Sequence, residues 1–267
     1  MNRSNGRWGE GMWQCLPLCR SYLSMHAASV RVVEPQSGTR SGGEVYWLVG
    51  IGRQAEFETL AVWVTEESGV PGWRATLLEL KSRGVERIRF ALSEDLLSFR
   101  EDLRAAFPGA MALPSFAQLL DRSVSQVTAR HRAPIATRLR EIVEADSGQE
   151  GRALLTGFEA SPWGARYPAL VADWRMALEQ AWALWTVSPA LRREVLSGDG
   201  VAAVLNRSLR KAVARHGCFA DVDEAHAFVV AALARAERRL EASRAGAVTE
   251  HNHHREGFRP RMDALGV

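Results

Sequence analysis

A run of basic side chains near residue 210 is the clearest place in this sequence for phosphate chemistry. These side chains recur at i and i+4, so on a helix they would share a face. No acid lies between Asp199 and Asp221 to neutralise them. They are candidates for contact with nucleic-acid phosphates, and the alternative interpretation is an ordinary solvated helix face. The candidates are Asn206, Arg207, Arg210, Lys211 and Arg215.

Few other side chains are spaced for chemistry. Cys15 and Cys19 could supply half of a zinc site, but no neighbouring Cys or His pair completes it, so two plain thiols are the better interpretation. A cluster of histidines in the polar tail, His251, His253 and His254, could bind metal adventitiously. Nucleophile triads, phosphate-cradling glycine loops and nucleotide fingerprints are absent from the sequence. The sequence therefore predicts no metal site.

The composition is that of a globular protein. The chain has 267 residues, of which 46% are hydrophobic and 24% charged, enough for a sizeable core. No stretch reaches the roughly 18 uninterrupted apolar residues of a membrane span, and no signal-peptide core precedes residue 24. Three cysteines, an odd number, make no disulfide framework. We therefore expect a cytoplasmic protein without membrane contact.

The basic residues are almost all arginine. The net charge is +3, and of 34 basic residues only Lys81 and Lys211 are lysines. Arginine suits bidentate contact with phosphate, although an arginine-rich composition can also reflect genome base composition. The arginine bias is thus compatible with nucleic-acid binding but does not by itself indicate it.

Hydrophobic periodicity divides the chain into two parts. After an irregular arm at 1–24, β-branched and aromatic runs predict three antiparallel strands, followed by helix, strand, helix and strand up to Pro114. Beyond Pro114 the pattern is helical, and Asp221 with Glu224 forms a capping box for the last helix. The expected strands are 30–32, 45–51, 57–64, 85–92 and 110–113. The expected helices are 73–83, 99–107, 115–129, 135–145, 150–159, 168–184, 189–196, 201–215 and 222–240.

Several strings in this order resemble the catalytic core of bacterial Mutator-type transposases. The most specific is Leu205-Asn206-Arg207-Ser208-Leu209-Arg210-Lys211, and Leu77 to Val85, Ala105 to Pro108 and Tyr167 to Val171 extend the likeness over roughly 25–240. The resemblance implies an α+β fold: a ribonuclease-H-like core, with a mixed five-stranded sheet, that is interrupted by a mostly helical insertion. The expected parts are an arm at 1–24, core at 25–114, helical insertion at 115–197, C-terminal core helices at 198–245 and a flexible tail at 246–267.

The resemblance also implies where catalytic carboxylates belong. The family cuts and joins DNA with an Asp-Asp-Glu set that holds two Mg²⁺ ions. Its positions fall here on His26, Glu94 and Ala203, with Asp95 beside Glu94. A family Cys and His fall on Ser115 and Gln118. Only about 25 residues precede the first position, so the family's N-terminal DNA-reading region is also expected to be missing.

These departures predict a degenerate copy, deficient in catalysis, that needs no cofactor and keeps weak, nonspecific affinity for DNA. An active Mg²⁺-dependent transposase or nuclease, with Glu94, Asp95 and Asp199 regrouped around one metal, is a second hypothesis. A third is an interaction protein that forms an oligomer with itself or with an intact transposase. Smaller alternatives are that His26 ligates a softer metal, and that Trp174, Trp182 and Trp185 stack on bases instead of packing in the core.

Overall fold

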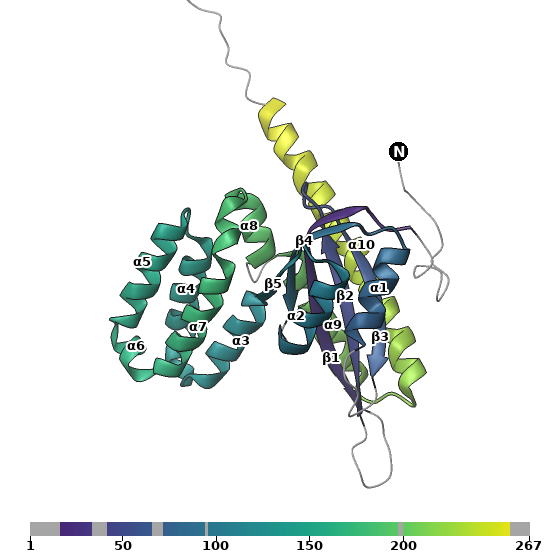
Figure 1. Ribbon diagram of the computed structural model, residues 1–267, viewed down its shortest axis with the longest axis horizontal. Coiled ribbons are helices and arrows are strands. Elements are labelled where there is room, and N and C mark those ends of the chain that lie inside the picture. Colours follow the sequence, from purple (N-terminus) through teal and green to yellow (C-terminus); the bar gives the residue numbers. More distant parts are fainter. Residues whose placement is uncertain (1–16, 34–41, 66–71, 94–95, 197–199, 257–267) are drawn as a thin grey trace, which may run out of the picture.

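The computed structural model describes residues 17–33, 42–65, 72–93, 96–196 and 200–256 of the chain. A mixed five-stranded sheet with helices on both faces forms one part of the molecule, and the helices from α3 to α8 form a second part at its side (Figure 1). The α+β class, the mixed five-stranded sheet and the largely helical second part are as the sequence predicts.

The sheet has the strand order β3-β2-β1-β4-β5. Strand β1 pairs antiparallel with β2 and parallel with β4; β2 and β3 are antiparallel, and β4 and β5 are parallel. This arrangement follows from the hairpin-linked first three strands and the helical crossovers that separate the later ones. The strands are β1 (Ser21–Val33), β2 (Gly42–Ile51), β3 (Phe57–Thr65), β4 (Arg87–Ser93) and β5 (Met111–Pro114).

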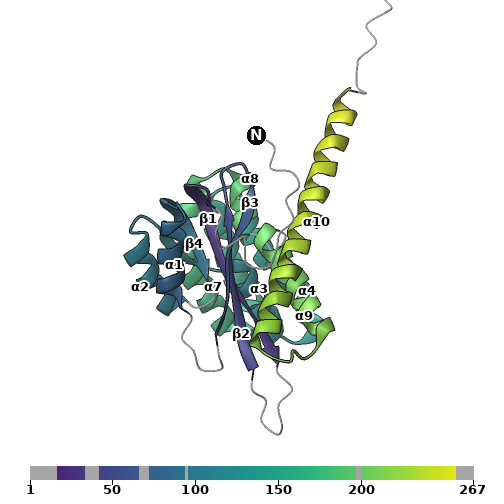
Figure 2. The same cartoon turned by 90° about the vertical axis from the view of Figure 1, so that its right-hand side faces the viewer.

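Two helices cover each face of the sheet. Figure 2 shows α1 (Trp73–Ser82) and α2 (Leu96–Ala106) on one side and α9 (Val201–His216) and α10 (Val222–Glu256) on the other. Helix α1 buries Trp73, Leu77 and Leu80 at helical spacing. The opposite face holds a separate apolar cluster, to which α9 contributes Leu205 and Leu209.

The helical insertion packs onto the sheet through a common core. Leu92 of β4 and Leu113 of β5 belong to the same cluster of buried side chains as Trp174 and Leu178 of α7. The insertion therefore shares buried apolar surface with the sheet, which is the main force holding the two together. Its helices are α3 (Phe116–Gln126), α4 (Ala129–Glu144), α5 (Gly148–Glu159), α6 (Pro162–Arg166), α7 (Pro168–Ala181), the 3-10 helix η2 (Trp182–Thr186) and α8 (Pro189–Leu196).

Strand β1 begins earlier than the sequence predicts. It starts at Ser21, inside the segment expected to be an irregular arm, and not near residue 30. The reason is its central position: Met25 and Ala27 belong to the cluster beneath α1, Val30 and Val32 belong to the cluster beneath α9 and α10, and Ser24 and His26 are buried as well. A strand covered on both faces loses the polar-apolar alternation that marks a strand in sequence.

Helix boundaries differ in three further places. Helix α4 spans Ala129–Glu144, so it includes Pro134 and most of the gap between the expected helices 115–129 and 135–145. The expected helix 168–184 ends at Ala181 and continues as η2, and the short helix α6 was not anticipated. Ser161, whose side chain accepts a hydrogen bond from the backbone N–H of Gly164, caps α6, and a five-residue helix is too short for a periodic signal.

Helix α10 extends to Glu256, past the point where a loose tail was expected. The expected capping box is present, because Asp221 accepts a hydrogen bond from the Glu224 backbone N–H at 2.7 Å. Farther along, Glu237 accepts hydrogen bonds from the backbone N–H and the hydroxyl of Thr59 in β3, and Arg244 pairs with Glu194 at 2.8 Å. No helix in the described ranges is long and apolar enough to cross a membrane.

Candidate catalytic crevice and nucleic-acid interface

A crevice opens where β4 ends beside the longer strand β1. The two strands pair up to His26 and Leu92, after which β1 continues paired with β2 only. Cavities of this kind, at the carboxyl ends of parallel strands, are the usual ligand sites of open sheets. The cavity measures about 220 Å³ and is lined by Ala27, Ala28, Ser29, Glu44, Tyr46, Trp73, Ser93 and Gln118.

Glu44 supplies the carboxylate of this crevice, and sequence reasoning missed it. The Ser29 hydroxyl donates to one carboxylate oxygen at 2.6 Å and the Tyr46 hydroxyl donates to the other at 3.0 Å. Glu44 and Tyr46 are two residues apart on β2, so their side chains lie on the same face as the buried Leu48. The signal that could have revealed Glu44 is an acidic residue at an inward-facing position of a strand with alternating burial.

Aromatic rings build the wall behind Glu44. Tyr46 stacks on Trp63 with ring centroids 5.5 Å apart, and Trp63 meets Trp73 edge-on at 5.2 Å. Trp73 in turn contacts Phe99 of α2 at 4.9 Å. Such offset and edge-to-face contacts fix ring orientations, so this side of the cavity is rigid.

Gln118 brings an amide into the same cavity. The resemblance placed the family histidine at this residue, and the structure positions it on α3 as a lining residue. Both amide atoms are buried, and neither has a hydrogen-bond partner among the described residues. Ser115 reaches the same region through its backbone N–H, which donates to the Ser93 carbonyl at 3.3 Å. An amide has both donors and an acceptor but no charge, so it cannot replace an ionisable histidine.

His26 lies on β1 but does not line the cavity. Its side chain is 8% exposed, and Nε2 lies 3.1 Å from the Ser24 hydroxyl. Burial lowers the pKa of His26 to about 4, so the ring is neutral at neutral pH. No group of three or more metal-ligating side chains occurs in the part of the chain that the structure describes. Among the described residues, His26 therefore has no partners with which it could ligate a softer metal.

Of the remaining expected catalytic positions, the structure describes Ala203 but not Glu94 or Asp95. Ala203 lies half-buried in the first turn of α9, a helix that packs against β1. Ser93 lines the crevice and directly precedes Glu94 in the sequence. Strand β1 thus contacts both β4 and α9, the elements at which the resemblance places the three carboxylate positions. Glu94, Asp95 and Asp199 lie outside the described residues, as do Cys15 and the side chains of His251, His253 and His254.

The predicted phosphate-contacting residues lie on the outer face of α9. Leu205, Leu209 and Val213 are buried on its inner face, so the side chains between them turn toward solvent. Arg210, Lys211 and Arg215 are exposed and take part in no ion pair among the described residues. Arg207 is exposed too, and the half-buried Asn206 accepts a hydrogen bond from Arg210 at 3.4 Å. Helix α9 itself contains no acidic residue, so all of its charged side chains on this face are basic.

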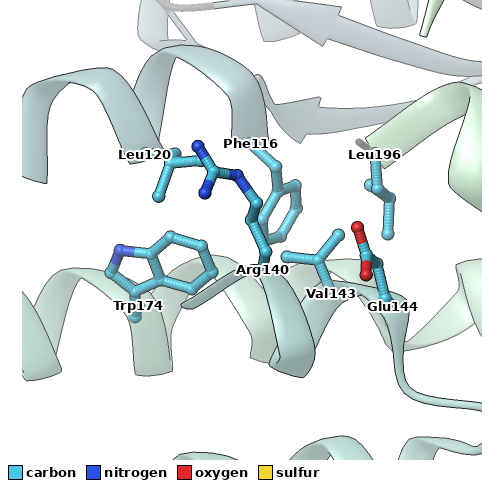
Figure 3. A pocket seen from close by; sticks show the side chains of 7 residues that line it. All are labelled: Phe116, Leu120, Arg140, Val143, Glu144, Trp174 and Leu196. Carbon is cyan, nitrogen blue, oxygen red and sulfur yellow. The ribbon is translucent and has the colours of Figure 1, made fainter. Parts of the chain in front are cut away.

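The tryptophans of the insertion serve packing. Trp174 is 1% exposed, and its indole N–H donates to the Ser123 hydroxyl at 2.9 Å, so it cannot stack on a base. The ring centroids of Trp182 and Trp185 are 4.8 Å apart, and the indole N–H of Trp185 donates to the Ala145 carbonyl. A second cavity, between α3, α4, α7 and α8, has Arg140 and Trp174 on its wall (Figure 3) and measures about 10 Å³. That volume holds one water at most.

Known proteins resemble the chain over most of its length. Its sequence is 29% identical over 209 residues to a probable transposase for an ISRM3-like insertion sequence element of Sinorhizobium fredii and to the ISRM3 transposase of Rhizobium meliloti. It is 27% identical over 208 residues to a probable insertion-sequence transposase of Corynebacterium diphtheriae. These alignments cover 78% of this chain, but 52%, 52% and 60% of the respective relatives. The chain thus spans about half the length of the curated relatives it matches.

The family assignment rests on a longer match. The sequence pattern of the Mutator family of transposases matches residues 11–243, which include the sheet, the helical insertion, α9 and most of α10. The chain belongs to the Mutator family of transposases.

Proposed function

We propose that this chain is a catalytically deficient member of its family that keeps sequence-independent affinity for DNA. One observation carries the first half: neither β1 nor α9 contains an aspartate or glutamate at any position. The family needs one carboxylate from each. A register slip of one or two residues, for example from His26 to Ala28, therefore supplies no acid.

The donor atoms of the crevice do not fit a pair of Mg²⁺ ions. Hard cations take several oxygen ligands, and two ions roughly 4 Å apart need several carboxylates between them. Among the described residues that line the cavity, Glu44 is the single carboxylate, and each of its oxygens accepts a hydrogen bond from a hydroxyl group. We therefore expect no metal-dependent strand cleavage at this crevice.

The second half of the proposal rests on the outer face of α9. Phosphate contacts by Lys and Arg release counterions from DNA and act on all sequences alike. An all-basic helix face without acids is suited to this, and the relatives that the chain matches are named as transposases of insertion sequence elements. The expected ligand is duplex DNA, bound through its backbone.

Binding is tested by fluorescence anisotropy with two unrelated duplexes between roughly 50 and 200 mM salt. We expect affinity for both to fall steeply with salt. The triple variant Arg210→Ala, Lys211→Ala and Arg215→Ala should bind both more weakly and reduce the salt slope by roughly one per lost contact. Arg138→Ala, which removes an exposed arginine paired with Glu141 at 2.9 Å, is the control. Salt-insensitive binding, or none, would contradict the proposal.

Catalysis is tested on supercoiled plasmid in Mg²⁺ or Mn²⁺ over a long incubation. We expect the plasmid to stay intact, because a missing metal ion costs several kcal/mol in the transition state. Metal-dependent nicking that disappears in Glu94→Gln would instead support the active-nuclease hypothesis. A plasmid nicked equally by wild type and Glu94→Gln would indicate a contaminating nuclease, which a second purification removes before the comparison is repeated.

A further inference from the structure

A cluster of polar side chains on the helical insertion lies apart from the crevice and from α9. The Tyr167 hydroxyl, between α6 and α7, is 2.9 Å from Nδ1 of His131 and 3.2 Å from the Thr128 hydroxyl. The Thr128 backbone N–H also donates to it at 3.4 Å. Four atoms from two distant chain segments therefore meet at one partly exposed point.

Two arginines flank this cluster. Arg166 ends α6 and has its Cζ 5.9 Å from the centre of the Tyr167 ring, and Arg130 precedes His131 on α4. Burial and then the charges of both arginines lower the pKa of His131. Hydrogen bonding by Thr128, followed by Arg166, lowers the pKa of Tyr167. In both shifts the arginine charges act in the same direction as a larger effect, which is burial for His131 and hydrogen bonding for Tyr167.

No carboxylate balances this charge in the described part of the chain. Its ion pairs include neither Arg130 nor Arg166, and no acid is among the causes that shift the pKa values of His131 and Tyr167. Other insertion arginines differ, because Arg138 pairs with Glu141 and Arg175 pairs with Glu159. An imidazole and a phenol thus meet beside the Arg166 guanidinium, Arg130 is next to His131 in the chain, and neither arginine has an acidic partner among the described residues.

We propose that Arg130, His131, Arg166 and Tyr167 form a phosphate-binding site through which the helical insertion contacts the DNA backbone. Guanidinium groups bind phosphate oxygens bidentately, and the imidazole N–H and the phenol hydroxyl add neutral donors. The site would give the chain a second contact with DNA in addition to α9. This inference rests on the proposed affinity for DNA, and it adds the insertion as part of the interface.

The test uses the full chain and two double variants of equal charge change. Arg130→Gln with Arg166→Gln removes the unpaired arginines, whereas Arg138→Gln with Arg175→Gln removes two exposed arginines that have acidic partners. We expect the first variant to bind duplex roughly tenfold more weakly or worse, and to reduce the salt slope by about two. The second should bind nearly as wild type does. Thermal unfolding of both checks that neither has lost its fold.

Equal affinities of the two double variants would overturn the inference. If the α9 triple variant weakens binding in the same assay, the proposed function stands while the insertion site falls. If wild type binds no duplex, both fall together. A titration with inorganic phosphate, followed by the NMR signals of the His131 ring, gives a readout independent of DNA. We expect these signals to shift in wild type and not in the Arg130→Gln, Arg166→Gln variant, and unshifted wild-type signals would count against the site.

Discussion

His26 is the residue to which the resemblance assigns the position of a metal-binding aspartate, and its surroundings suit a neutral ring. The side chain is almost fully buried in the central strand, where only Ser24 offers it a hydrogen bond among the described residues. An aspartate there would bring a negative charge into a site that has no described cation beside it. The environment of residue 26 thus favours an uncharged side chain.

Acid should expose the cost of keeping His26 neutral. Its folded pKa is about 4 and the unfolded value is near 6.5, so the stabilisation is complete above about pH 6.5 and is lost as the pH falls toward 4. Between pH 7 and 4.5 the group should contribute a loss of about 2 to 3 kcal/mol. Urea unfolding of wild type and His26→Gln at both pH values measures this loss. Parallel losses in the two proteins would contradict the prediction.

The residues of the crevice differ in how far sequence could reveal them. Gln118 could be located from the sequence, because the spacing of the strings that resemble the family assigns the family histidine to this residue. Glu44 was not found, since its role depends on the β1-β2 register that sets Ser29 opposite Tyr46. Register is a tertiary property, and sequence patterns fix it only where one face of a strand is clearly polar.

Among the elements, α9 was the most predictable and β1 the least. Helix α9 has one buried and one charged face, which is the pattern that periodicity detects. Strand β1 is covered on both faces, so only its outer end, where Arg31 is exposed, alternates in a recognisable way. The assignment of the insertion as helical succeeded for the same reason as α9. Its helix bounds were harder to predict, because α6 depends on capping by Ser161 and because α4 continues through Pro134.

The turn between α5 and α6 gives a sharp prediction with an internal control. A Cβ on Gly164 would lie 2.2 Å from the Glu159 carbonyl oxygen, whereas one on Gly157 in α5 would meet nothing within 4 Å. Gly164→Ala should lower the free energy of unfolding by about 1 to 3 kcal/mol, and Gly157→Ala should raise it by about 0.5 to 1 kcal/mol. Chemical denaturation measures both. Changes of the same sign would show that the α5-α6 contact is looser than described.

Across the whole molecule, the sheet and the insertion share one buried cluster. We therefore expect them to unfold together, since exposing the insertion's apolar side would also expose Leu92 and Leu113. This coupling was not predictable from sequence, because the patterns of β4 and of α7 each show an apolar face without showing that the two faces meet.

Leu113→Ala tests the coupling from the sheet side. Its side chain is fully buried, so truncation should cost about 2 to 5 kcal/mol. Hydrogen exchange followed by mass spectrometry should then show faster opening in peptides from both β1 and α7. Faster exchange confined to one of the two would mean that the insertion and the sheet are separate cooperative units.

The hydrogen bonds between Glu237 of α10 and Thr59 of β3 have a further consequence. Strand β3 is at the edge of the sheet, where free backbone groups can recruit a strand from another molecule. Helix α10 accepts a hydrogen bond from one of those backbone donors, the Thr59 N–H, and packs against β3. It therefore hinders intermolecular β-pairing at this edge. A chain truncated before this helix would expose the edge of β3. We expect such a chain to aggregate, so that it loses solubility before its DNA affinity can be measured.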